Sequence, residues 1–160
     1  YETTLPRAAL ALLVGIAAGT VLVTAAFVLS DIEYFRQWGL KTGTIPMIVV
    51  YSAVLISLGL LLLAPLPWFI CHRAGQRGPA AAVLLGVVLT FIVTLGLLTY
   101  GFGLLGNSGF SAADSGGETW KDGVLTAHGW VEAAKASGIV ALFGVPIALV
   151  VWRVAYRRTA

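Results

Sequence analysis

The sequence predicts an all-α integral membrane protein, an antiparallel four-helix bundle with a structured extracytoplasmic loop cap. Of its 160 residues, 59% are hydrophobic and only 11% are charged, whereas a soluble domain is typically about 25% charged. The apolar residues fall into four blocks, which we place at about 8–30, 45–70, 80–105 and 133–152. We treat residues 1–160 as a single membrane domain.

The length of these blocks predicts that they are transmembrane helices. The first three contain no Asp, Glu, Lys or Arg, and at about 1.5 Å per residue each can cross a hydrocarbon core of about 30 Å. The fourth is shorter, because its uncharged part runs only from 136 to 152. A span must pair its backbone N–H and C=O groups internally, and a helix does so within one segment.

The first span begins after Pro6 and Arg7 and carries Gly15 and Gly19 four residues apart. Such a pair leaves a flat strip on one helix face, which lets a second helix approach closely. We therefore expect Gly15 and Gly19 to be helix-packing positions.

Prolines predict irregularities in the second span. Pro65 and Pro67 remove two backbone donors near its end, so we expect a kink or a frayed exit between residues 64 and 68. The third span ends in Gly101, Gly103 and Gly106, which loosen a helix as it leaves the bilayer.

Two longer polar loops, at 31–44 and 106–135, lie between the spans. Tryptophan is enriched where a bilayer meets water, so we expect four of the five tryptophans to be interfacial anchors: Trp38, Trp120, Trp130 and Trp152.

The basic residues predict the orientation. Six arginines lie at the termini and in the turn around 71–79, whereas four basic residues lie in the two longer loops. Basic residues accumulate on the cytoplasmic side, so we expect both termini in the cytoplasm. The alanine-, glycine- and arginine-rich composition indicates a bacterial inner membrane.

The loop 106–135 holds the candidates for chemistry. His128 and Glu132 are four residues apart, and Asp122 precedes them; on one helix face an imidazole and a carboxylate can act as acid and base. Glycines interrupt any helix through Asp114, Glu118 and Asp122, and no H-x-x-x-H or C-x-x-C pattern is present. The sequence therefore predicts no metal site, no cofactor and a mainly solvated polar cap.

Three functions fit these patterns. The first is a non-catalytic accessory subunit that docks to partner subunits of a larger membrane complex, since no ionisable residue lies deep in a span. The second is a protein that binds or transports a lipid or other hydrophobic molecule, entering between the kinked second span and the fourth. The third is a membrane enzyme that uses His128, Asp122 and Glu132. The net charge of +3 reflects topology, and we expect no nucleic-acid partner.

Overall fold

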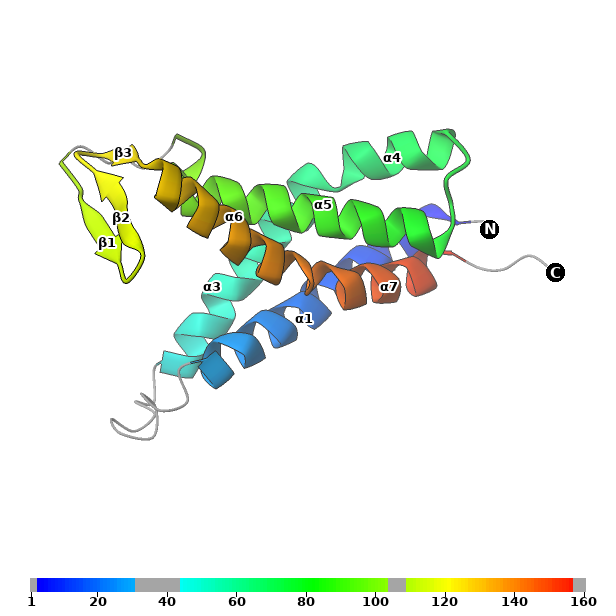
Figure 1. Cartoon of the computed structure of the whole chain (residues 1–160). Coiled ribbons are helices and arrows are strands. Elements are labelled where there is room, and N and C mark those ends of the chain that lie inside the picture. Colours follow the sequence, from blue (N-terminus) through cyan, green and yellow to red (C-terminus); the bar gives the residue numbers. More distant parts are fainter. Residues whose placement is uncertain (1–2, 31–43, 104–108, 157–160) are drawn as a thin grey trace.

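The computed structural model describes residues 3–30, 44–103 and 109–156, and most of them are helical (Figure 1). The helices are α1 (Leu5–Ser30), α3 (Thr44–Leu58), α4 (Pro65–Arg73), α5 (Pro79–Leu98), α6 (Ala127–Ala141) and α7 (Gly144–Ala155). A π-helical segment, η1 (Gly59–Leu63), joins α3 to α4, and a 3₁₀ turn, η2 (Gly101–Gly103), follows α5. The strands are β1 (Ala112–Asp114), β2 (Gly117–Lys121) and β3 (Val124–Leu125).

Four helical stretches are long and apolar enough to cross a membrane. They cover Leu5–Ala26, Ile45–Arg73, Pro79–Leu98 and Ala127–Ala155. The second stretch combines α3, η1 and α4, and the fourth combines α6 and α7. Each overlaps one of the four apolar blocks predicted from the sequence, and the second and fourth contain theirs completely.

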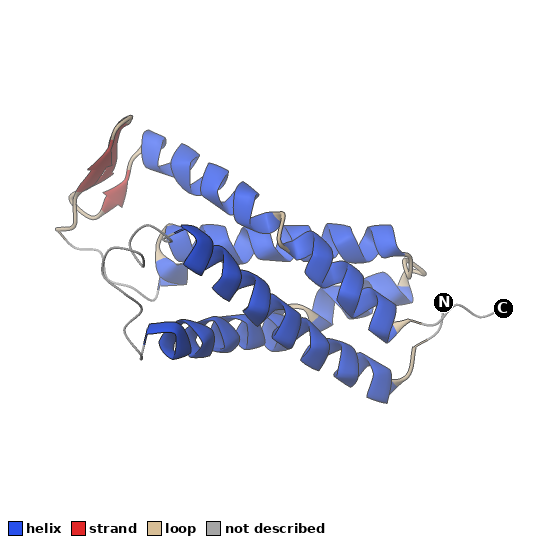
Figure 2. Ribbon diagram, turned by 90° about the horizontal axis from the view of Figure 1, so that it is seen from below, coloured by secondary structure: helices blue, strands red, loops and turns tan. Residues whose placement is uncertain are grey.

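The predicted helical fold is confirmed for most of the described chain, but the expectation of an all-α protein misses a three-stranded antiparallel sheet in the order β1-β2-β3, which lies between the third and fourth stretches (Figure 2). Asp122 (φ 51°) and Gly123 (φ 80°) form the two-residue connection between β2 and β3. Asp-Gly is a preferred pair for such a connection, because both positions need a left-handed backbone. Thr119 and Trp120 in β2 are residue types that favour strands.

The third stretch ends at Leu98 rather than at the expected 105. Thr99 leaves the helical conformation (φ −92°, ψ −91°), and its hydroxyl donates to Leu95 O at 2.7 Å. Gly101 and Gly103 then take positive φ values of 55° and 76°. The chain therefore turns at these glycines instead of continuing as a helix.

The fourth stretch begins at Ala127 rather than at the expected 133, so Glu132 and Lys135 lie inside α6 and not in a loop. Thr126 caps this helix, because its side-chain oxygen accepts a hydrogen bond from Gly129 N at 3.0 Å. Such a cap satisfies one of the free N–H groups of the first turn. The threonine-capped start is the signal that the sequence prediction did not use.

The second stretch changes direction just before residues 64–68, the segment in which its prolines predict a kink. Pro65 cannot donate to the carbonyl four residues earlier, and the backbone adopts the π-helical segment η1 before α4 begins. In Figure 1, α3 and α4 run in clearly different directions on either side of it.

Helix α7 joins the two halves of the molecule, because both α1 and α5 pack on it. A Cβ atom added to Gly86 of α5 would lie 2.6 Å from Ala148 Cβ, and one added to Gly144 would lie 2.8 Å from Gly86 O. The two backbones therefore touch. The buried residues of α6 and α7 continue this contact as a stripe of small side chains: Gly129, Ala133, Ser137, Ala141, Gly144 and Ala148.

The two glycines of α1 lie against neighbouring helices. An added Cβ on Gly15 would lie 2.6 Å from Val151 Cγ2 of α7, and one on Gly19 would lie 3.1 Å from Ile56 Cγ2 of α3. The second stretch and α7 approach both glycines, because Leu60 Cδ1 would lie 3.3 Å from the added Cβ of Gly15 and Ile147 Cδ1 3.4 Å from that of Gly19.

The α1–α3 pair and the α5–α6 pair diverge toward the end of the molecule that carries the sheet (Figure 1). Helix α3 packs chiefly on α1, while α6 packs on α5. The described ends of the chain lie together at the opposite end, beside the turn between α4 and α5 (Figure 1).

Replacing both Gly15 and Gly19 by leucine is expected to lower the thermal unfolding midpoint of the protein in detergent. Overpacking a close contact costs about 1–3 kcal/mol per site, and Val151 and Ile56 occupy the space that the new side chains need. Gly138→Leu is the control, since no atom lies within 4 Å of an added Cβ there. Equal midpoints for the two variants would contradict the close approach.

Candidate functional site

We define the loop cap as the three strands together with the first two turns of α6. A hydrogen bond joins its two parts, because His128 Nε2 in α6 lies 2.8 Å from Asp114 Oδ1 at the end of β1. The same carboxylate oxygen accepts hydrogen bonds from Gly116 N at 2.7 Å and Gly117 N at 3.1 Å. A carboxylate can only accept, so His128 carries its proton on Nε2.

These donors hold the pKa of the Asp114 carboxyl below its ordinary value. The hydrogen bond from His128 is the largest cause, followed by the one from Gly116 N. Each donor stabilises the ionised form of the carboxyl group. Asp114 therefore acts as a fixed negative centre around which the β1–β2 turn and the start of α6 are arranged.

Glycines let the strands and the helix approach closely. An added Cβ on Gly116 would lie 2.7 Å from His128 Cε1, and one on Gly129 would lie 2.1 Å from Thr119 O. The imidazole therefore packs directly against the β1–β2 turn, and the first turn of α6 packs against the backbone of β2. Thr126 adds a hydrogen bond from its hydroxyl to Thr119 O at 3.2 Å.

An aromatic cluster attaches the loop cap to the end of α5. Tyr100 lies next to Trp120 and Trp130, with ring centroids 5.4 and 6.2 Å away, and Phe110 lies 5.9 Å from Trp120. The Tyr100 hydroxyl also accepts a hydrogen bond from Leu125 N at 3.2 Å. Trp120 and Trp130 thus belong to one cluster, and Tyr100 is its central residue.

The other two tryptophans that were expected to be interfacial anchors are Trp38 and Trp152. Trp38 lies outside the described residues, as does most of the loop 31–44. Trp152 lies on α7 at the opposite end of the molecule, where its Nε1 donates to Arg77 O at 3.0 Å. The described part of the chain therefore has aromatic residues near both ends of its long helices, a distribution that is typical of proteins with two membrane–water interfaces.

The three residues proposed for catalysis are engaged separately. His128 pairs with Asp114, Glu132 pairs with Lys135 at 2.6 Å, and Asp122 forms the β2–β3 turn. No hydrogen bond or ion pair joins any two of the three within the described chain. In residues 3–30, 44–103 and 109–156, no group of three or more His, Cys, Asp or Glu side chains could hold a metal ion.

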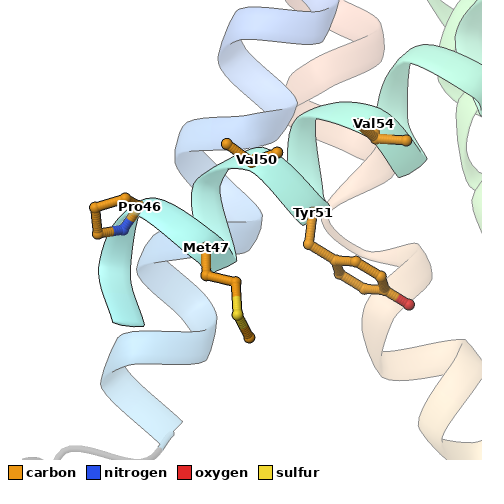
Figure 3. Close-up of a pocket in the computed structure, with 5 residues that line it drawn as sticks. All are labelled: Pro46, Met47, Val50, Tyr51 and Val54. Carbon is orange, nitrogen blue, oxygen red and sulfur yellow. The ribbon is translucent and has the colours of Figure 1, made fainter. Parts of the chain in front are cut away.

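A second feature is a shallow hollow of about 460 Å³ on α3 (Figure 3). It is lined by Pro46, Met47, Val50, Tyr51 and Val54. Met47, Val50, Tyr51 and Val54 are each more than half exposed, and in Figure 3 Met47 and Tyr51 extend from the same side of the helix. The only side-chain polar group there is the Tyr51 hydroxyl, which makes no hydrogen bond with any described residue.

The chain matches no protein-family model, and no curated protein or solved structure shows significant similarity to it. The features that bear on function are therefore the loop cap and the exposed face of α3.

The hydrogen bonds accepted by Asp114 make the loop cap sensitive to acid. Because the folded-state pKa of Asp114 is lowered from 3.8, its contribution is fully present above the unfolded value and is lost as the pH falls through the folded one. The protection factors of the β1 and β2 amides, which compare the observed exchange rate with the intrinsic rate at the same pH, should stay high near neutral pH and fall below about pH 4. Asp114→Asn should remove most of this dependence.

Asp122→Asn is the matched control, because the Asp122 side chain takes no part in the pair. If hydrogen-exchange protection of the β1 and β2 amides depends on pH in the same way in Asp114→Asn, in Asp122→Asn and in the unmodified protein, the contact between Asp114 and His128 does not stabilise the cap.

Proposed function

We propose that this chain is a polytopic integral membrane protein that acts as a non-catalytic accessory subunit of a larger membrane complex. Its four long helices form an antiparallel bundle that crosses a bacterial inner membrane, with both termini in the cytoplasm and the loop cap outside. The proposal rests on the unpacked face of α3, and the distribution of charge supports its orientation.

The described arginines and carboxylates lie at opposite ends, while the two described lysines, Lys121 and Lys135, lie on the side of the carboxylates. Arg7, Arg73, Arg77 and Arg153 belong to the end with the termini, and all four described carboxylates belong to the loop cap: Asp114, Glu118, Asp122 and Glu132. Arginines collect on the cytoplasmic side of membrane proteins. This separation supports cytoplasmic termini.

The face of α3 is the surface that fits a partner. Tyr51 lies six residues after Ile45, the first residue of the second stretch, or about 9 Å along the helix. At that depth a hydroxyl group without a partner is costly. Hydrogen bonds between helices inside a bilayer remove that cost, so a neighbouring helix with a carbonyl or hydroxyl acceptor fits the hollow beside Tyr51.

The loop cap supports a structural role for the exposed end. Its His128 and Asp114 pair with each other, and Glu132 pairs with Lys135. Groups already engaged in this way stabilise the cap, whereas catalysis needs an acid or base that can reach a substrate.

A photoreactive amino acid at position 50 is the direct test. We expect it to form one cross-link of defined mass, in the native membrane, to a protein that also co-purifies with the unmodified chain in mild detergent. Position 84 on α5 is the control, because Leu84 is about as exposed as Val50 but lies outside the hollow. Cross-links from position 50 to lipid alone would contradict the docking of a partner there.

Filling the hollow provides a second test of the same surface. Val54→Trp keeps the helix apolar and places a large ring among the lining residues, so we expect the partner to be lost while the thermal unfolding midpoint changes little. A lone chain that retains a lipid-sized mass in native mass spectrometry would favour the lipid-binding function instead.

A further inference from the structure

The fourth stretch is interrupted between α6 and α7, and the interruption frees a backbone acceptor. In a continuous α-helix Leu142 N would donate to Gly138 O, but here it donates to Ile139 O at 3.2 Å. Phe143 N likewise donates only three residues back, to Val140 O at 3.0 Å. The carbonyl of Gly138 therefore lacks the donor that a continuous helix would supply, and such a loss is costly inside a bilayer.

The helix surface around Gly138 is open. No atom from another part of the described chain lies within 4 Å of a Cβ atom added there, and Ala134 lies one turn earlier on the same face. The residues of α6 that are buried form a separate stripe. Ile139 and Leu142, beside Gly138, are both well exposed. A helix from outside the molecule can therefore approach the backbone of α6 closely at this face.

The packing of α6 and α7 on α5 fixes the depth of Gly138. Gly86 of α5 would meet Gly144 O-side backbone contacts at the start of α7, because a Cβ added to Gly86 lies 3.0 Å from Gly144 O. At the other end, the rings of Tyr100 and Trp130 lie 6.2 Å apart. The fourth stretch thus runs antiparallel to α5 in one register between these two contacts.

Gly138 and the exposed Tyr51 of α3 lie at matching depths. In this register Gly138 is level with Ile92, which lies six residues, or about 9 Å, before α5 ends at Leu98. Tyr51 lies about 9 Å from Ile45, the outer end of the second stretch. The Tyr51 hydroxyl is a donor that bonds to no described residue, and Gly138 O is an acceptor without its α-helical donor. The two groups therefore complement each other.

The two faces also complement each other in shape. Helices α3 and α6 both run from the loop-cap end toward the end with the described termini (Figure 1), so they would pack in parallel within one membrane. With Tyr51 level with Gly138, Met47 is level with Ala134, because each pair is one turn apart. Met47 and Tyr51 are 72% and 66% exposed and extend from the same side of α3 (Figure 3). Each large side chain of α3 thus meets a small residue of α6.

Within one molecule these faces are not in contact. Helix α3 packs chiefly on α1 and α6 on α5, and the two pairs diverge toward the loop cap (Figure 1). We propose that α6 of one copy of this chain docks on α3 of a second copy, with the Tyr51 hydroxyl donating to Gly138 O. The inference rests on the proposed function, since it names the helix that covers α3. Because the two faces differ, copies joined in this way form a closed ring or a row rather than a two-fold dimer.

Cross-linking between differently tagged copies is the direct test. In a Cys71→Ser background, one copy carries Met47→Cys and the other carries Ala134→Cys, and both are oxidised together in the native membrane. We expect a disulfide-linked dimer that carries both tags, and we expect none from either variant alone.

The control for this experiment replaces Ala134→Cys by Leu97→Cys, since Leu97 is exposed at a similar depth on α5. Equal yields of mixed dimer from Ala134→Cys and Leu97→Cys, or no mixed dimer at all, would overturn the proposal. So would a disulfide that forms within one chain when Met47→Cys and Ala134→Cys are placed in the same copy.

Three further variants test the contact itself. Gly138→Leu should lower the yield of mixed dimer about tenfold, the effect of overpacking a close contact, without lowering the unfolding midpoint of the separated chain. Tyr51→Phe removes only the hydroxyl and should lower the yield about threefold, the typical effect of one hydrogen bond between helices in a bilayer. Gly78→Leu is the matched control, because an added Cβ there also meets no atom within 4 Å. The same yield from all three variants would contradict the contact.

The cross-link from position 50 described above separates this inference from the proposed function. Attachment to α6 of a second copy supports both. Attachment to a different protein would rule out the second copy and leave the accessory function in place. Attachment to lipid alone would overturn both.

Discussion

The close contact between α5 and α7 is the constraint on which the rest of the structure depends. Gly86 and Gly144 bring the two backbones together, and Ala148 fits against the same glycine. Because α1 also packs on α7, this one helix holds both halves of the molecule. In lipid, where apolar side chains gain little by leaving the solvent, such small-residue contacts carry much of the packing energy. A side chain at Gly86 would therefore disturb the whole arrangement of helices.

The loop cap is organised by a different kind of interaction. It contains few buried apolar residues, with Leu125 the only hydrophobic side chain of its strands that is fully buried. Asp114 instead collects donors from a turn and from α6, and Tyr100 bonds and stacks against it from the end of α5. Polar and aromatic contacts suit a segment that emerges into water, since a sheet of this size has no core of its own.

Length and composition were enough to predict the long helices and the bend in the second stretch. Spans without charge must be helical in lipid, and Pro65 removes a specific donor, so the helices and the bend could be expected. The sheet was not expected, because the acidic residues of the loop were considered at helical spacing. The Asp122-Gly123 pair, which is typical of a hairpin turn, was not considered. The pairing of His128 with Asp114 joins residues that only a hairpin brings together, and spacing along a helix pointed to Glu132 instead. The start of α6 was placed too late, because the charged residues Glu132 and Lys135 are of a kind that is typical of loops between membrane spans.

The divergence of the two helix pairs has a consequence for the lipid around them. Helices α3 and α6 separate toward the loop cap, whereas α4 and α7 stay linked through His72 and Tyr156 at the other end (Figure 1). In a bilayer, a molecule of this shape displaces more area from the leaflet nearer the loop cap than from the opposite one. In the membrane orientation proposed above, the wedge so formed is accommodated most easily where the membrane bulges toward the loop-cap side.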